Sequence, residues 1–181
     1  NCERLVRVVD DLLDAVKINA GGLTLRLEPT KLVDLLEQAL ESRRFAHDAV
    51  NVRLQIDEAT RDVEIVIDPV RIQQVLDNLL SNAVKFSETQ APIDLKASRS
   101  EGGVRVSVVD RGVGIPKDFQ HAVFETFSLA DSSSTRRRGG VGVGLSVAKM
   151  IVEAHRGKIG FTSTPGEGSC FYFDLPLEQG V

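Results

Sequence analysis

The first apolar pattern along the chain is that of a helix which packs against other helices. Residues 2–18 place Leu5, Val9, Leu12 and Val16 at steps of four, three and four residues, which is the spacing of a heptad seam. A homodimeric helical bundle would cover this stripe, and so would packing against the globular part of the same chain. We expect the first of these two arrangements.

Beyond residue 22 the pattern changes to short strands and helices in alternation. Strict alternation of apolar and polar residues predicts strands over 23–29, 50–56, 62–68, 91–100, 103–110, 158–164 and 169–177. A period of 3.6 residues predicts helices over 30–49, 69–86 and 143–155, with Thr30 as the N-cap of the first. Helices and strand pairs in this order predict an α+β two-layer sandwich, with one mixed sheet and helices packed on one of its faces.

Composition and charge narrow the class of protein. The chain has 181 residues, 42% of them hydrophobic, and a formal net charge of -4, which disfavours a nucleic-acid binder. It has no apolar run near the ~18 residues that span a bilayer and no signal peptide. Cys2 and Cys170 stand far apart and form neither a metal motif nor a disulfide framework. Because the chain does not begin with Met, we expect a fragment whose parent carries any membrane anchor.

Candidate chemistry begins on the helix predicted over 69–86. At ~100° per residue, Asn78, Asn82 and Lys85 lie within about 60° of one another, at the edge of the apolar face. An amide oxygen is a hard, neutral ligand suited to Mg²⁺, and a lysine suits phosphate. The alternative is a solvated polar face, and the helix alone does not decide between them.

Two glycine-rich loops follow. Asp110 ends a predicted strand, where it can accept a hydrogen bond from an exocyclic amine, and Gly112 and Gly114 allow a planar ligand to approach the backbone. A simple tight turn is the alternative. The second loop, "RRRGGVGVGLSVAK" over 136–149, places alternating glycines before a helix, which is typical of an anion site. It lacks the G-K-[ST] ending of a P-loop and does not follow a strand, so it is not a dinucleotide fingerprint either.

Four motifs in this order carry a family resemblance. N-L-L-x-N-A-x-K-F, D-x-G-x-G-I-P, F-E-x-F and G-G-x-G-x-G-L resemble the N, G1, F and G2 boxes of the sensor histidine kinases, whose catalytic ATP-binding domain belongs to the GHKL ATPase superfamily. The resemblance covers nearly the whole chain. It implies the end of a dimerisation helix over 1–20, a linker strand over 21–29 and the ATP-binding domain over 30–178.

The resemblance also assigns roles to residues. It implies that Asn82 holds Mg²⁺, that Asn78 lies near the metal and the phosphates, that Lys85 contacts phosphate and that Asp110 binds the amino group of adenine. Asn78 and Lys85 are the implied catalytic residues. Further residues implied to line ATP are Gly112, Gly114, Phe127, Arg138, Gly140, Gly142, Gly144, Leu145 and Ser169. Phe124 and Phe127 are implied to anchor a lid over 128–139.

The implied reaction is transfer of the γ-phosphoryl group of Mg–ATP to a histidine of the parent kinase, for relay to the receiver domain of a response regulator. Such a kinase is a homodimer through its N-terminal helix, and this portion of it is cytoplasmic. The family's acceptor histidine is followed by an acidic residue and a proline, and His47, His121 and His155 do not match that pattern. We therefore interpret all three as structural or solvated, and we expect the fragment alone to be unable to phosphorylate itself.

Two departures leave alternatives open. Hydrolysing members of the superfamily usually carry a glutamate where this chain has Asn78, and an amide cannot act as a general base, which disfavours a GHKL-type ATPase. Leu129 stands where the family commonly has Arg or Gln, so any phosphate contact from that position is in doubt. A degenerate kinase that only regulates partners is the remaining alternative.

Overall fold

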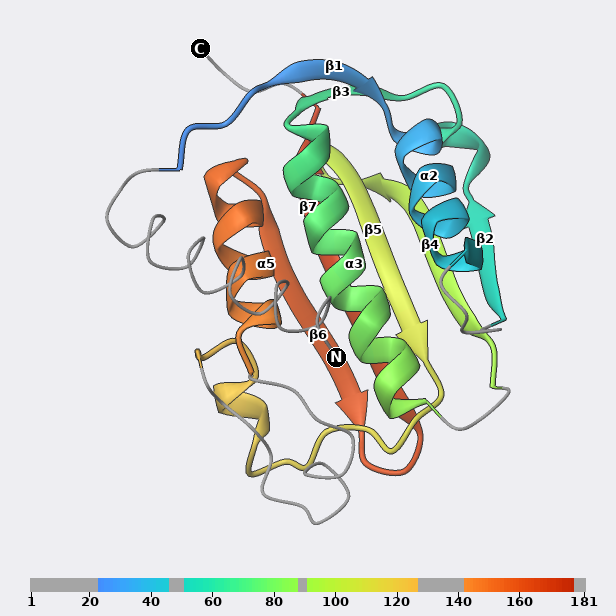
Figure 1. Ribbon diagram of the computed structural model, residues 1–181, viewed down its shortest axis with the longest axis vertical. Coiled ribbons are helices and arrows are strands. Elements are labelled where there is room, and N and C mark those ends of the chain that lie inside the picture. Colours follow the sequence, from blue (N-terminus) through green and yellow to red (C-terminus); the bar gives the residue numbers. More distant parts are fainter. Residues whose placement is uncertain (1–22, 46–50, 88–90, 127–141, 178–181) are drawn as a thin grey trace.

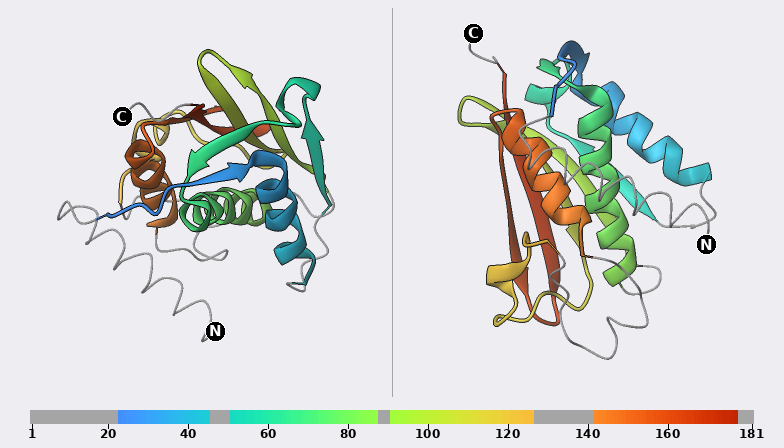
Figure 2. Two further views of the ribbon diagram at one scale, coloured as in Figure 1. Left: turned by 90° about the horizontal axis from the view of Figure 1, so that it is seen from above. Right: turned by 60° about the vertical axis from the view of Figure 1, so that its left-hand side comes forward.

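The computed structural model describes residues 23–45, 51–87, 91–126 and 142–177. The N-terminal helix predicted over residues 2–18 and the lid predicted over 128–139 lie outside these ranges. The described chain forms two layers, a twisted sheet and a set of helices that cover one of its faces (Figures 1 and 2). The predicted α+β sandwich is thereby confirmed, and none of the described helices is long and apolar enough to cross a membrane.

The main sheet has five strands in the order β2-β4-β5-β7-β6. Their bounds are Val52–Ile56 for β2, Ile93–Ser100 for β4, Gly103–Asp110 for β5, Lys158–Thr164 for β6 and Gly168–Pro176 for β7. Strand β2 runs parallel to β4, while the other neighbours are antiparallel. The sheet is therefore mixed, as predicted, and the β4–β5 and β6–β7 hairpins turn at Gly102 and Gly166, which both have a positive φ.

A second, two-stranded sheet corrects the prediction of a single sheet. Strand β1 (Glu28–Lys31) pairs antiparallel with β3 (Glu64–Ile67). The strand predicted over 23–29 begins only at Glu28, because its partner strand ends where Pro69 starts a helix and cannot continue the ladder. Thr30 lies within β1, where its Oγ1 donates to the carbonyl of Glu28 at 3.1 Å. The prediction of Thr30 as a helix N-cap is wrong.

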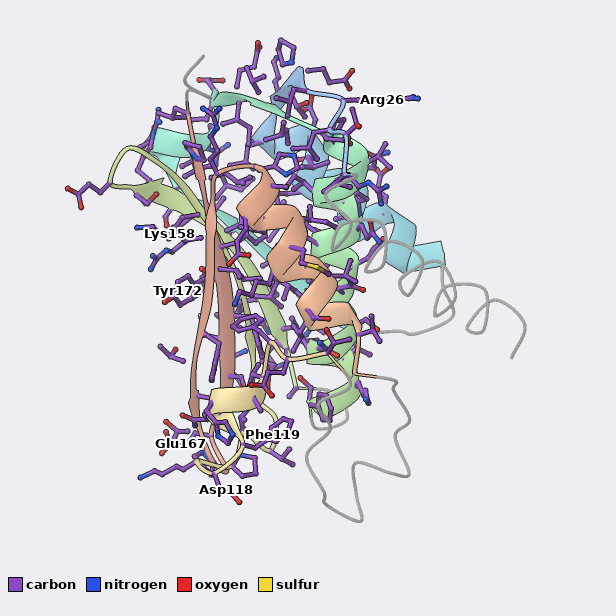
Figure 3. The ribbon with its side chains drawn as sticks, turned by 90° about the vertical axis from the view of Figure 1, so that its left-hand side faces the viewer. Arg26, Asp118, Phe119, Lys158, Glu167 and Tyr172 are labelled. Carbon is purple, nitrogen blue, oxygen red and sulfur yellow. The ribbon has the colours of Figure 1, made fainter. Side chains whose placement is uncertain are left out.

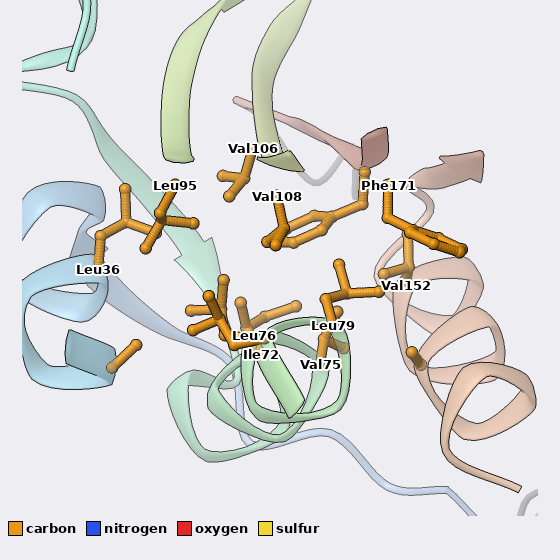
Figure 4. Close-up of a cluster of buried hydrophobic side chains, with 14 of the residues drawn as sticks. Leu36, Ile72, Val75, Leu76, Leu79, Leu95, Val106, Val108, Val152 and Phe171 are labelled. Atoms are coloured by element: carbon orange, nitrogen blue, oxygen red, sulfur yellow. The ribbon is translucent and has the colours of Figure 1, made fainter. Parts of the chain in front are cut away.

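Three α-helices are described: α2 (Leu32–Phe45), α3 (Pro69–Phe86) and α5 (Gly144–Ala154). Short 3₁₀ helices occupy Glu58–Thr60 and Gln120–Ala122. Helix α3 begins where the sequence predicts, with Pro69 in its first turn and Asp68 as the N-cap. Its apolar face is buried against the sheet and the other helices (Figure 4). The buried residues of α3 are Ile72, Val75, Leu76, Leu79, Leu80 and Ala83.

The opposite face of the sheet carries polar side chains. Tyr172 and Lys158 project from this face, away from α5 (Figure 3). The Arg105 guanidinium lies 4.1 Å from the centre of the Tyr172 ring and donates two hydrogen bonds to Asp174, at 2.8 and 2.7 Å. The helices therefore cover one face of the main sheet, and cross-strand polar pairs cover the other.

Candidate functional site

The polar flank of α3 carries the two asparagines and the lysine, and Asn78 contacts the start of α5. All three side chains are half-buried. The Asn78 Nδ2 donates to the backbone carbonyl of Gly144 at 3.0 Å, and the Lys85 Nζ lies 4.6 Å from the centre of the Phe86 ring. The Asn82 amide forms no hydrogen bond with another residue that the structure describes. One amide of this flank is therefore bound within the fold, and the other has no hydrogen bond to the described part of the chain.

The contact between Asn78 and Gly144 gives a structural reason for an amide at position 78. A glutamate or aspartate there could not donate to the Gly144 carbonyl, and its charge would face a carbonyl oxygen. Position 144 is also closely packed against Asn78, because a Cβ added to Gly144 would lie 3.2 Å from the Asn78 Oδ1. Position 78 therefore joins α3 to α5, in addition to any role toward a ligand.

Asp110 ends β5 with a nearly buried side chain, 6% exposed. Its Oδ1 accepts a hydrogen bond from the backbone N–H of Gly112 at 2.9 Å. Burial raises the pKa of Asp110 above its usual value, and hydrogen bonds from the backbone of Gly112 and Ser169 oppose that rise. The carboxylate is thus oriented by backbone groups and largely stripped of water, which suits an acceptor for a ligand's N–H.

Gly112 and Gly114 bring the loop after β5 against two other segments. A Cβ at Gly112 would lie 2.2 Å from the carbonyl oxygen of Phe86, at the end of α3. Gly114 has a φ of 65°, and a Cβ there would lie 2.2 Å from the carbonyl oxygen of Thr164, at the end of β6. These glycines are therefore required by the packing of the loop itself, and contact with a ligand stays a prediction.

The start of α5 lies at the same end of the domain. The residue before the helix, Val143, provides no side-chain cap for the first backbone N–H groups of α5, and uncapped N–H groups of this kind suit an anion. Gly142, the residue before Val143, has a φ of 72°. Leu145, in the first turn of α5, is half-buried. Gly140, Phe127 and Arg138 lie outside the described residues, so their predicted roles stay predictions.

Ser169 belongs to a small hydroxyl network that the sequence does not reveal. The Oγ of Ser163 accepts from the N–H of Ile115 at 2.8 Å, donates to the carbonyl of Gly168 at 3.0 Å and lies 3.0 Å from the Ser169 Oγ. Ser169 is itself paired with Asp110 across β5 and β7. Ser163 thus fixes the loop after β5 to the β6–β7 hairpin, although a serine in a half-exposed strand gives no signal of this role.

Phe124 of the F-x-x-F motif supports this end of the domain by packing. Its ring centre lies 5.9 Å from that of Phe161 and 6.4 Å from that of Phe171, in edge-to-face arrangements. The aromatic cluster joins the loop before the lid segment to β6 and β7.

The two described histidines agree with the prediction of structural or solvated residues. His121 is exposed. His155 is fully buried, with its Nε2 accepting from the N–H of Asp68 at 3.0 Å and its Nδ1 lying 2.8 Å from the carbonyl of Ile151. Because Nε2 accepts a hydrogen bond, the ring hydrogen is on Nδ1, and burial lowers the pKa of His155, which favours this neutral form. His47 lies outside the described residues.

Comparison with known proteins identifies the family. Residues 67–179 match the family described as "Histidine kinase-, DNA gyrase B-, and HSP90-like ATPase". The chain is 37% identical over 186 residues to the sensor protein GacS of Pseudomonas syringae pv. syringae, which covers 99% of this chain and 20% of that protein. It is also 37% identical over 176 residues to the circadian input-output histidine kinase CikA of Synechococcus elongatus, covering 96% of this chain and 23% of that protein. The chain thus spans about a fifth of the length of these relatives.

Solved structures agree with this relationship. Full-length ShkA in complex with AMPPNP superimposes with a TM-score of 0.82 at 30% identity, over 98% of this chain and 37% of that one. A nucleotide-free form of the catalytic domain of the histidine kinase ThkA superimposes with a TM-score of 0.69 at 26% identity, over 84% of this chain and 96% of that one. The chain therefore belongs to the histidine kinase-, DNA gyrase B- and HSP90-like ATPase family, as an ATPase domain of the sensor histidine kinase type.

Proposed function

We propose that the chain is the catalytic ATP-binding portion of a sensor histidine kinase. It binds Mg–ATP and transfers the γ-phosphoryl group to a histidine on the dimerisation domain of its parent, for relay to the receiver domain of a response regulator. One observation carries the proposal: three segments far apart in sequence meet at one end of the domain. The Asn78–Gly144 hydrogen bond joins α3 to α5, and an isolated bridge between Ser87 and Gly112 joins the end of α3 to the loop after β5.

Asp110 is the proposed determinant for the base. Its carboxylate is buried and oriented by backbone N–H groups, so it accepts a hydrogen bond from the exocyclic amine of adenine. Guanine presents a carbonyl oxygen at the corresponding position, which would face the carboxylate without a hydrogen between them. A buried acceptor left facing another acceptor is costly, so we expect the site to prefer adenine over guanine.

Asn82 and Lys85 are the proposed residues on the phosphate side. Mg²⁺ is usually bound by one or two protein groups together with substrate phosphates. Within the described residues no group of three or more His, Cys, Asp or Glu could hold a metal, whereas the Asn82 amide is half-buried and without a hydrogen bond to another of them. This donor set fits a metal ion that arrives with the nucleotide, and when bound the ion neutralises phosphate charge. Lys85 adds a positive charge, and catalysis is by positioning and electrostatics.

The acceptor and the partners belong to the parent kinase. We propose that the N-terminal heptad segment forms a homodimer, that the acceptor histidine lies on the parent's dimerisation domain, and that this portion of the parent is cytoplasmic. His155 cannot act as the acceptor, because its ring is fully buried and hydrogen-bonded within the fold. The fragment should therefore bind ATP without phosphorylating itself.

Calorimetric titration of the chain with AMPPNP, with and without Mg²⁺, tests the proposal. We expect saturable 1:1 binding that Mg²⁺ strengthens, and much weaker binding of the corresponding guanine nucleotide. Absence of saturable binding would contradict the proposal and favour a degenerate regulatory module. Sustained release of ADP from ATP without any acceptor would instead favour a GHKL-type ATPase.

A further inference from the structure

Helices α3 and α5 run antiparallel (Figure 1), and hydrogen bonds join them at two separate points. At the candidate nucleotide site, the Asn78 Nδ2 donates to the carbonyl of Gly144 at 3.0 Å. At the far end, the backbone N–H of Asp68 donates to the Nε2 of His155 at 3.0 Å. At 1.5 Å per residue, the two points lie about 15 Å apart along α3 and about 17 Å apart along α5. The two hydrogen bonds therefore hold both ends of one helix pair.

Asp68 connects this helix pair to the segment that precedes β1. Its Oδ1 accepts from the N–H of Arg71 at 3.1 Å, which caps α3. Its Oδ2 accepts from the backbone N–H of Arg26 at 2.9 Å. Because the Asp68 carboxylate is almost entirely buried, 6% exposed, each oxygen depends on these partners in place of water. The carboxylate is thus shared between its own helix and residues 23–27.

His155 transmits the contact to α5. The ring is fully buried at the C-terminal end of α5, and its Nδ1–H donates to the carbonyl of Ile151 at 2.8 Å, so the ring orientation is fixed by its own helix. Its Nε2 is then the single acceptor for the N–H of Asp68. A displacement of α5 relative to α3 would break this hydrogen bond and leave two buried polar atoms without a partner.

We propose that Asp68 and His155 are positioning residues that couple residues 23–27 to the nucleotide site through the α3–α5 pair. The inference rests on the proposed function, since it assigns a nucleotide to the Asn78–Gly144 end. Nucleotide that fixes α3 against α5 at that end strengthens the Asp68–His155 hydrogen bond at the other end. Through Asp68 it also holds the backbone of Arg26, and because coupling between two sites is reciprocal, restraint of residues 23–27 strengthens nucleotide binding.

Hydrogen exchange of single backbone amides, followed by NMR with and without Mg–AMPPNP, tests the coupling. In the unchanged chain we expect nucleotide to slow exchange of the Arg26 amide at least threefold, although Arg26 lies at the end of α3 remote from the site. In H155F the Asp68 carboxylate keeps both hydrogen bonds, so Arg26 should stay protected without nucleotide. Nucleotide should then give no further slowing, a signature that a merely structural role would not produce.

Two further variants complete the test. In D68N the asparagine oxygen can still cap α3, but its NH₂ group cannot accept from Arg26, so the Arg26 amide should exchange fast in both states while nucleotide affinity falls less than fivefold. V70A is the matched control, because Val70 lies beside Asp68 and is 75% exposed. It should behave as the unchanged chain.

The outcomes separate the inference from the proposed function. Nucleotide binding by calorimetry without any slowing at Arg26 overturns the coupling and leaves the proposed function standing. Nucleotide-dependent slowing of the Arg26 amide that persists in H155F also overturns the coupling. If H155F does not fold, slowing that persists in D68N overturns the coupling instead. Absence of nucleotide binding overturns both.

Discussion

The two ends of the α3–α5 pair both carry buried or half-buried polar side chains, but these side chains differ in how fully they are hydrogen-bonded within the chain. At the end beside Arg26, both carboxylate oxygens of Asp68 and both ring nitrogens of His155 have partners within the chain. At the other end, the Asn82 amide forms no hydrogen bond with a described residue, and Asp110 is buried with a raised pKa. Polar groups that are fully hydrogen-bonded within the chain hold the helices together. Polar groups with hydrogen-bonding capacity left over are suited to bind a ligand.

This difference has an energetic counterpart. A buried polar group with partners contributes to stability, and losing one partner costs about 1–3 kcal/mol. A buried carboxylate whose solvation is incomplete lowers stability, a common feature of sites that bind a ligand. Substitutions at the two ends should therefore have opposite consequences for unfolding and for binding.

The largest effect on binding is expected for D110N. Asparagine is nearly isosteric and its oxygen can still accept from Gly112, but the charge that strengthens a hydrogen bond to adenine is lost. Hydrogen bonds to charged groups are worth about 1.5–3 kcal/mol, so affinity for AMPPNP in calorimetry should fall about 10- to 150-fold. Thermal unfolding should change little, because removal of the buried charge offsets the weakened hydrogen bond from the Ser169 backbone. A clear loss of stability would show that Asp110 is a structural residue.

At the opposite end of the helix pair, we expect H155F to lower stability and to leave nucleotide affinity nearly unchanged, which is the reverse of D110N. The phenylalanine leaves the buried N–H of Asp68 without an acceptor, whereas the Ile151 carbonyl keeps its hydrogen bond from the backbone N–H of residue 155. The free energy of unfolding in urea should therefore fall by about 2 kcal/mol. Affinity for AMPPNP should change by no more than a few-fold. A drop in affinity as large as that of D110N, with stability intact, would contradict the distinction between the two ends.

A smaller and more specific effect is expected for N82A. Removal of the proposed metal ligand should reduce affinity for Mg–AMPPNP about tenfold, or about 1.4 kcal/mol, and leave binding of metal-free AMPPNP almost unchanged. Calorimetry with and without Mg²⁺ measures the affinity for Mg–AMPPNP and the affinity for metal-free AMPPNP separately. Equal losses with and without Mg²⁺ would place Asn82 outside the metal site.

The smallest expected effect is the dependence of stability on pH. Burial lowers the pKa of His155 below the ordinary histidine value of about 6.5, so below pH 6.5 the unfolded chain binds more protons than the folded one. The contribution to stability is complete above pH 6.5 and declines as the pH falls toward the lowered pKa. We expect the free energy of unfolding to fall by at most about 1.4 kcal/mol between pH 7.5 and 5.5, because the window reaches one pH unit below 6.5.

H155F is the control for this dependence, because it lacks the titrating ring and should lose that part of the slope. The raised pKa of Asp110 acts in the opposite direction, because the folded chain binds that proton before the unfolded chain does as the pH falls. D110N should therefore lose this stabilisation at acidic pH. A slope that is unchanged in H155F would assign the pH dependence to other groups.

Regular patterns made most of the fold predictable. Helix α3 follows from its apolar period, from Asp68 before Pro69 and from the residues that face the core. The hairpin of β4 and β5 follows from strict alternation around glycines. The β1–β3 sheet was not predictable, because its length depends on where α3 begins in space and not on the residues of the strand itself.

The candidate site also has a part that the sequence predicts and a part that it does not. Motifs identify residues such as Asn78 and Asp110 by type and spacing. They give no indication that Asn78 donates to Gly144 or that Ser163 braces the loop after β5, because these contacts join distant segments through backbone atoms. The contact of Asp68 with Arg26 escapes sequence reasoning for the same reason.

The backbone contact at Arg26 has a consequence for variation among related chains. Asp68 binds the amide of residue 26 and not its side chain, so every amino acid except proline can supply the donor. The linker can therefore diverge freely in sequence while the contact persists. Conservation of the side chain at position 26 would overlook the contact, and the absence of proline there would be its only trace within the linker.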